Sequence, residues 1–179
     1  MRCRLLHWAG AIGVALLTAS CASPPAGPAM QAAAAPATRA AAPGAVAVTV
    51  IGGQETSALD GPNIGDAAFK AAVEASLLQA RVFEPGVEGV APARYALGAT
   101  IVRLAKPLFG GTFTVELEVG WTLLDRSRGQ VLLRKSITST GSAGMSDALV
   151  GATRLRLAVE AAARANIEHL LRELAALPY

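Results

Sequence analysis

Cys21 is the side chain with the clearest chemical context in this chain. It ends the sequence Leu17-Thr-Ala-Ser-Cys21, which follows Arg2, Arg4 and an apolar run from Leu5 to Leu17. A basic start, a short apolar run and small residues before a cysteine are typical of a bacterial lipoprotein leader. We therefore predict that residues 1–20 are a signal peptide and that Cys21 becomes the acylated first residue of the mature chain.

An alternative interpretation of the same segment is a membrane-spanning helix. The apolar run contains His7 and is shorter than the ~20 apolar residues that a spanning helix needs. Thr18, in turn, stands where such leaders usually place leucine. The lipidated cysteine is the interpretation that the run length favours.

The remaining nucleophiles and bases do not form a recognisable catalytic set. His169 is the one histidine left after leader removal, and Ser142 lacks the first glycine of a Gly-x-Ser-x-Gly motif. Glu116 and Glu118 would lie about 7 Å apart on one strand face, where solvated charges are common. The glycine pairs 52–53 and 110–111 lack the context of a phosphate loop. We predict no catalytic residues, so the chain is not expected to be an enzyme.

Charge and cysteine content exclude several other classes of site. Arg2 and Arg4 leave with the leader, so 14 of the 16 basic residues remain against 13 acidic ones. A nearly neutral chain without clustered cations is not expected to bind nucleic acid. Cys3 also leaves, and no His/Cys cluster or Asp-rich loop remains, so we predict no metal and no cofactor.

One turn is unusually apolar. In Lys106-Pro-Leu-Phe-Gly-Gly111, Leu108 and Phe109 occupy a hairpin tip that would normally be polar. Such tips either fold back over the core or contact another molecule. Leu108 and Phe109 are therefore our candidates for a partner contact, whereas Trp121 is expected in the core.

The segment after Cys21 differs in composition from the rest of the chain. Residues 22–44 are almost entirely Ala, Pro, Gly and Ser, with Met30 among the few exceptions. Such a segment is not expected to contribute to a core. We predict a linker, with an end-to-end distance of about 25–30 Å as a flexible coil. Residues 45–179 would then form a single domain.

Periodicity predicts the elements of that domain. Alternation of apolar and polar residues is clearest over 112–123, where it predicts a half-buried strand. A polar turn at 125–129 then joins it to the next strand as an antiparallel hairpin. The full set of predicted elements is a strand at 45–51, a helix from Asn63 or Asp66 to about Ala80, a loop at 84–92, strands at 95–105, 112–123 and 131–140, a flexible loop at 141–146, and a helix from Asp147 to Ala176.

This order, β-α-β-β-β-α, predicts an α+β fold. We expect one largely antiparallel four-stranded sheet with both helices packed on one face. The charged stripe of the last helix, at Glu160, Arg164, Glu168 and Arg172, would face solvent on the side opposite the core. The other face or an edge of the sheet would remain open to partners.

The whole pattern resembles the small auxiliary lipoproteins of Gram-negative envelopes, including those that assist lipid-transport ABC systems. The resemblance is carried by the stretches 69–83, 95–101, 119–125 and 158–174. It implies a compact α+β domain and no catalytic residues. In that group a residue other than Asp after the lipidated cysteine, here Ala22, goes with sorting to the outer membrane.

We therefore expect a lipid-anchored lipoprotein on the periplasmic face of the outer membrane. It would act as a non-enzymatic adaptor that binds a protein partner, or a second copy of itself, through a sheet edge or through Leu108 and Phe109. The alternative is a module that holds a lipid or small molecule between sheet and helices, which would require a large apolar cavity. An enzyme acting on envelope sugars or lipids is the third and least favoured hypothesis.

Overall fold

The computed structural model describes residues 23–33, 41–57, 60–84 and 92–179. The signal peptide, Cys21 and the predicted loop at 84–92 fall outside these ranges wholly or for the most part. The elements are α1 (Gly27–Met30), β1 (Val46–Ile51), α2 (Asp66–Gln79), β2 (Tyr95–Ala105), β3 (Phe113–Asp125), β4 (Gln130–Ala143) and α3 (Gly151–Ala175).

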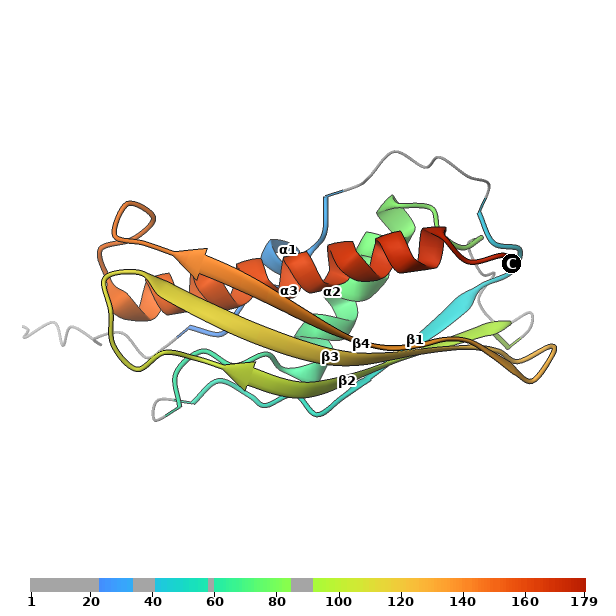
Figure 1. Cartoon of the computed structure of the whole chain (residues 1–179), viewed down its shortest axis with the longest axis horizontal. Coiled ribbons are helices and arrows are strands. Elements are labelled where there is room, and N and C mark those ends of the chain that lie inside the picture. The colour runs from blue at the N-terminus through green and yellow to red at the C-terminus, as the bar shows by residue number, and fades with distance from the viewer. Residues whose placement is uncertain (1–22, 34–40, 58–59, 85–91) are drawn as a thin grey trace, which may run out of the picture.

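The four strands form one mixed sheet in the order β1-β2-β3-β4. The α+β fold is confirmed, with α1 added before the predicted elements. β2, β3 and β4 pair antiparallel, whereas β1 pairs parallel with β2. The parallel pair arises because α2 carries the chain back along the sheet between β1 and β2, and a crossover helix of this kind joins parallel strands (Figure 1).

Both long helices cover the same face of the sheet, as the sequence predicts. The space between the layers is filled by large side chains, and Trp121 is buried there against Phe69, with their ring centroids 6.0 Å apart. The Trp121 indole N–H donates to Asn166 Oδ1 on α3 at 2.9 Å, and Asn166 Nδ2 donates to the Ile137 carbonyl at 2.8 Å. The buried amide thus ties α3 to two strands.

α3 packs closely against β4 at Gly141. A Cβ atom at this position would lie 2.2 Å from Ala162 N and 2.3 Å from Ala158 O, which leaves no room for a side chain. The prediction of a flexible loop from residue 141 is therefore wrong at its start. β4 continues to Ala143 because α3 packs directly on its last residues.

The helix ends also differ from expectation. The residue before α2 is Gly65, which makes no side-chain cap, and Asp66 instead accepts a hydrogen bond from the Gly53 N–H at 2.7 Å. α3 begins at Gly151 rather than at Asp147. The Asp147 carboxylate is used earlier, because it accepts from the Gly144 N–H at 2.7 Å and closes a turn.

The largest departure lies in the predicted linker. Residues 25–32, which we call the N-terminal strap, pack across α2 and α3 (Figure 1). Met30 is fully buried, so the expectation that residues 22–44 contribute nothing to the core is wrong. Two residues of the charged stripe of α3 receive the strap instead of facing solvent: Glu160 is buried and accepts from the Ala26 N–H at 2.9 Å, and Arg164 donates to the Ala29 carbonyl. Arg172, at the end of the stripe, is exposed as expected.

Candidate functional site

Exposed apolar side chains gather at one end of the molecule. Two loops meet there, the β2–β3 tip and the β4–α3 connection, because the first residue of β3, Phe113, pairs with the last residue of β4, Ala143. A Cβ at Gly111 would lie 3.8 Å from Met145 Sδ, so the loops are in contact. We call this surface the apolar end; its large exposed side chains are Leu108, Phe109, Met145, Leu149 and Val150.

Leu108 and Phe109 are 85% and 88% exposed, so they do not fold back over the core. The sequence-based choice between the two arrangements of this tip is thereby decided in favour of exposure. Leu149, on the other loop, is 83% exposed. Five of the nine large exposed apolar residues within the described part of the chain belong to this end, although it contains only two loops.

Arg154 holds the backbone that carries Leu149. Its Nη1 donates to the carbonyls of Ala148 at 3.0 Å and Leu149 at 2.8 Å, and its guanidinium lies 5.4 Å from the centre of the Phe113 ring. Arg154 is itself buried. Because the loop is tied to the first turn of α3, Leu149 is presented to solvent by a fixed backbone.

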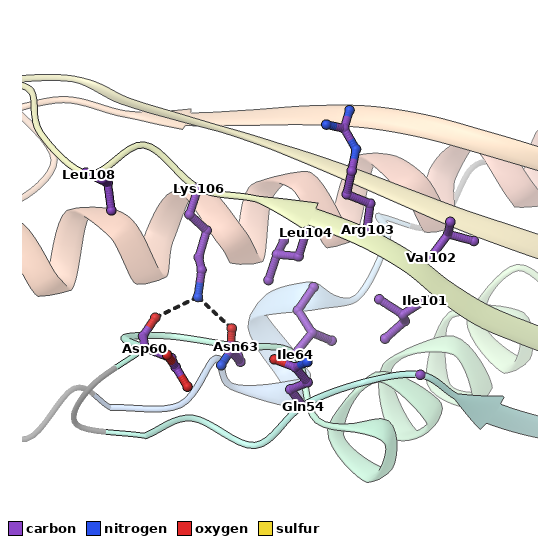
Figure 2. A pocket seen from close by; sticks show the side chains of 11 residues that line it. Gln54, Asp60, Asn63, Ile64, Ile101, Val102, Arg103, Leu104, Lys106 and Leu108 are labelled. Atoms are coloured by element: carbon purple, nitrogen blue, oxygen red, sulfur yellow. Dashed lines mark hydrogen bonds between the residues drawn. The ribbon is translucent and has the colours of Figure 1, made fainter.

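Lys106 holds the other loop in a similar way. Figure 2 shows its side chain reaching across a surface pocket of about 380 Å³ to the segment after β1. Its Nζ donates to the carbonyls of Asp60 at 2.7 Å and Pro62 at 3.2 Å, and to Asn63 Oδ1 at 2.6 Å. Burial lowers the pKa of Lys106, and the nearby charge of Asp60 partly offsets this effect. With three protein acceptors on its ammonium, Lys106 acts as a structural clamp in this pocket.

A second candidate surface is the outer edge of β1, which is an edge strand of the sheet within the described residues. The Tyr95 N–H donates to the Ala45 carbonyl, and in a parallel pair this places the backbone groups of alternate residues toward β2. The N–H and C=O groups of Val46, Val48 and Val50 therefore point to the outer edge. Beside that edge runs a groove of about 250 Å³, lined by Ala45, Val46, Val48, Glu74, Leu77, Leu78, Phe83 and Glu84.

The polar residues considered from the sequence are not brought together. His169 lies near the end of α3, with Nε2 3.3 Å from Glu173 Oε1, whereas Ser142 lies at the opposite end of the sheet and shares a hydrogen bond with Thr114. Lys135 donates to Glu173 and lowers its pKa, an effect to which His169 adds less.

The two strand glutamates are each bound to a different neighbour. Glu116 pairs with Arg103, and Glu118 accepts from the Ser136 hydroxyl at 2.7 Å. They therefore do not act together as a carboxylate pair on this face of the sheet.

Neither a membrane-spanning helix nor a metal site occurs among the described residues. In that part of the chain no helix is both long and apolar enough to cross a bilayer, and no group of three His, Cys, Asp or Glu side chains could hold a metal ion. Cys21 lies outside the described ranges, so its lipidation stays a prediction.

The sequence matches no family model, and no curated protein matches it. Its fold recurs in solved structures. The chain has the fold of a Xanthomonas campestris protein of the family DUF330. The two share 12% identity with a TM-score of 0.59, over 83% of this chain and 91% of that one.

Two other structures are less similar to this fold. One is a predicted lipoprotein from Caulobacter crescentus, with a TM-score of 0.49 and 17% identity over 73% of this chain and 87% of that one. The other is a minor lipoprotein from Acinetobacter baumannii, with a TM-score of 0.49 and 11% identity over 74% and 94%. At 12% identity, the comparison with the Xanthomonas campestris protein establishes the shared fold alone.

The sequence predicted two of the five exposed residues of the apolar end. It predicted Leu108 and Phe109 but missed Met145, Leu149 and Val150. The last two were missed because the predicted helix starting at Asp147 included them. The available signal was the glycine at 151, which follows two large apolar residues in a short connection. The buried Asn166 was missed because a lone amide on a helix carries no sign of its partners.

Proposed function

We propose that this chain is a lipid-anchored accessory lipoprotein of the cell envelope, attached through Cys21 to the periplasmic face of the outer membrane. In this proposal it is not an enzyme but binds an extended segment of a protein partner along the edge of β1. The leader pattern at residues 1–21 supports the anchor, and Ala22 supports the choice of membrane. The outer edge of β1, which no other described strand pairs with, lies beside an apolar groove, and this is the observation that carries the binding role.

The edge of β1 offers what an added strand requires. Val46, Val48 and Val50 turn their backbone groups to the outer side of β1, where no other strand pairs among the described residues. Main-chain hydrogen bonds to such an edge provide affinity that depends little on sequence. Leu78, which is 70% exposed, borders the groove that would receive the alternate side chains of the added strand. Long exposed edges are otherwise usually blocked, because they invite pairing.

The adaptor is favoured over a lipid carrier because side chains occupy the space that a ligand would need. Trp121, Phe69 and Leu117 fill the layer between sheet and helices and are at most 1% exposed. The two pockets described above are open surface features instead. The scattered positions of His169, Ser142 and the strand glutamates also favour a binding protein over an enzyme.

The test is photo-crosslinking in the native cell, with benzoylphenylalanine incorporated at position 78. We expect one discrete protein adduct, because the probe would lie beside the bound strand. The same probe at Ala71, which is exposed on α2 outside the groove, should give at least a several-fold weaker adduct.

A backbone variant separates strand addition from simple contact. Val46→Pro removes an outward N–H without breaking the ladder to β2, and proline is tolerated on edge strands. It should abolish the adduct at position 78, whereas Val46→Ala should retain it. An adduct that survives Val46→Pro, or equal labelling from positions 71 and 78, would refute binding by strand addition.

A further inference from the structure

We infer that the apolar end rests on the bilayer that holds the Cys21 lipid, with Leu108, Phe109 and Leu149 inserted among the lipids. This inference depends on the lipidation proposed above and adds an orientation to it: the start of α3 faces the membrane. The occupant of the apolar end is therefore lipid rather than a protein.

The first step is the length of chain between Cys21, which carries the anchor, and the N-terminal strap. The strap is fixed from Pro25, which is buried, and the Ala26 N–H bonds to Glu160. Ala26 is the fifth residue after Cys21, and five fully extended Cα–Cα steps span at most about 17 Å. A lipid on Cys21 thus holds Glu160 near the bilayer, which a linker extending to residue 44 would not do.

The second step is the direction of the strap. Ala26 is bound at Glu160 and Ala29 at Arg164, so the strap runs in the same direction as α3. Figure 1 shows the first described residues, in blue, on the side of the molecule where α3 begins. Glu160 lies nine residues after Gly151, or about 14 Å along the helix axis. The chain from Ala26 back to Cys21 can therefore place the lipid at the level of the apolar end, and little beyond it.

The third step is the chemistry of the surface at that level. Leu108, Phe109 and Leu149 project from loops whose backbones are held by Lys106 and Arg154. Lys106 and Arg154 both donate hydrogen bonds to protein oxygens, so the apolar end presents apolar side chains rather than free positive charge. Proteins without a spanning helix contact bilayers through such side chains, and an acyl anchor supplements a contact that is weak alone. The short segment between Cys21 and Ala26 and the apolar end thus act on the same membrane.

The test uses a tryptophan probe in the mature, lipidated protein, residues 21–179, reconstituted into phosphatidylethanolamine/phosphatidylglycerol vesicles. Phe109→Trp places the probe at the tip, and Leu78→Trp is the control, at an exposed leucine of the groove. Fluorescence from Trp121, the one native tryptophan of the mature chain, is measured in the unsubstituted protein. Brominated acyl chains should quench the probe at position 109 at least twofold and leave the probe at position 78 unchanged. The quenching should persist in about 1 M salt, where the Debye length is only about 3 Å.

Flotation of the vesicles and mass spectrometry of Cys21 separate the possible failures. If the acylated protein floats with the vesicles but both probes are quenched equally little, the orientation is wrong and the lipid anchor stands. A blue shift at position 109 without quenching by bromine would mean that protein, such as a second copy, covers the tip, and this would also overturn the inference. A protein that carries no acyl chain and does not float would refute the anchor and the orientation together.

Discussion

At the scale of single residues, Gly141 determines how closely α3 packs on the sheet. We predict that Gly141→Ala lowers the free energy of unfolding by about 3 kcal/mol, since a Cβ would overlap the backbone of α3 and overpacked cores cannot relax without cost. Gly120→Ala is the matched control, because a Cβ there meets only ordinary contacts at 3.8 Å or more. Urea denaturation of the two variants checks this. Equal stability of both would mean that α3 does not approach β4 as described.

The roles of Gly141 and Asn166 could not be predicted from the sequence. Gly141 and Asn166 have no unusual sequence context, yet one permits a close helix–strand contact and the other joins Trp121 to β4. Their roles depend on which segments far apart in the chain become neighbours. Trp121, by contrast, lies in an alternating strand and could be assigned to the core from its sequence position alone.

At the scale of elements, the N-terminal strap is part of the folded domain rather than a linker. Met30 fills space between α2 and α3, so Met30→Ala should lower the free energy of unfolding by about 2–4 kcal/mol through loss of burial and creation of a cavity. Met145→Ala, at an exposed position, should change it by less than about 0.5 kcal/mol. Chemical denaturation checks the pair. Identical stabilities would restore the linker interpretation.

The strands and long helices were predictable because each buries one face and therefore carries a period of two or of 3.6 residues. β2 was predicted with its observed bounds, and β3 and β4 lie within two or three residues of theirs. The strap carries no such period, since its buried residues are Pro25, Met30 and Ala32. Side chains of α3 and α2 accept hydrogen bonds from its backbone N–H groups at Ala26 and Ala32. Its docking could not be read from composition.

α2 ends where the sequence offers no usual stop signal. Arg81 adopts a positive φ of 49°, and the N–H groups of Arg81 and Val82 bond to the carbonyls of Leu78 and Leu77. This is the hydrogen-bond pattern of a Schellman motif, in which glycine normally takes the left-handed position. The pattern of the amphipathic face predicted the end of the helix to within about one residue even so.

At the scale of the whole molecule, the two candidate surfaces lie toward opposite ends. Val46, at the start of β1, pairs with Tyr95, whereas the apolar end follows Ala105 at the other end of β2. Eleven residues of strand separate these points, or about 36 Å. A domain that rests on the bilayer through Leu108 and Phe109 would therefore direct the β1 edge away from the membrane, toward partners in the periplasm.

This arrangement predicts that the length of the segment between Cys21 and Ala26, and not only its presence, determines how the domain is held at the bilayer. Inserting about ten Gly/Ser residues between Ala22 and Ser23 triples the free segment, so the effective concentration of the apolar end at the bilayer should fall roughly fivefold. Quenching of Phe109→Trp by brominated lipids should then decrease, although the protein still floats with vesicles. A ten-residue insertion after Tyr179, at the far end of α3, is the control and should leave quenching unchanged. Undiminished quenching in the variant with the Gly/Ser insertion would show that the apolar end binds lipid strongly without help from the strap.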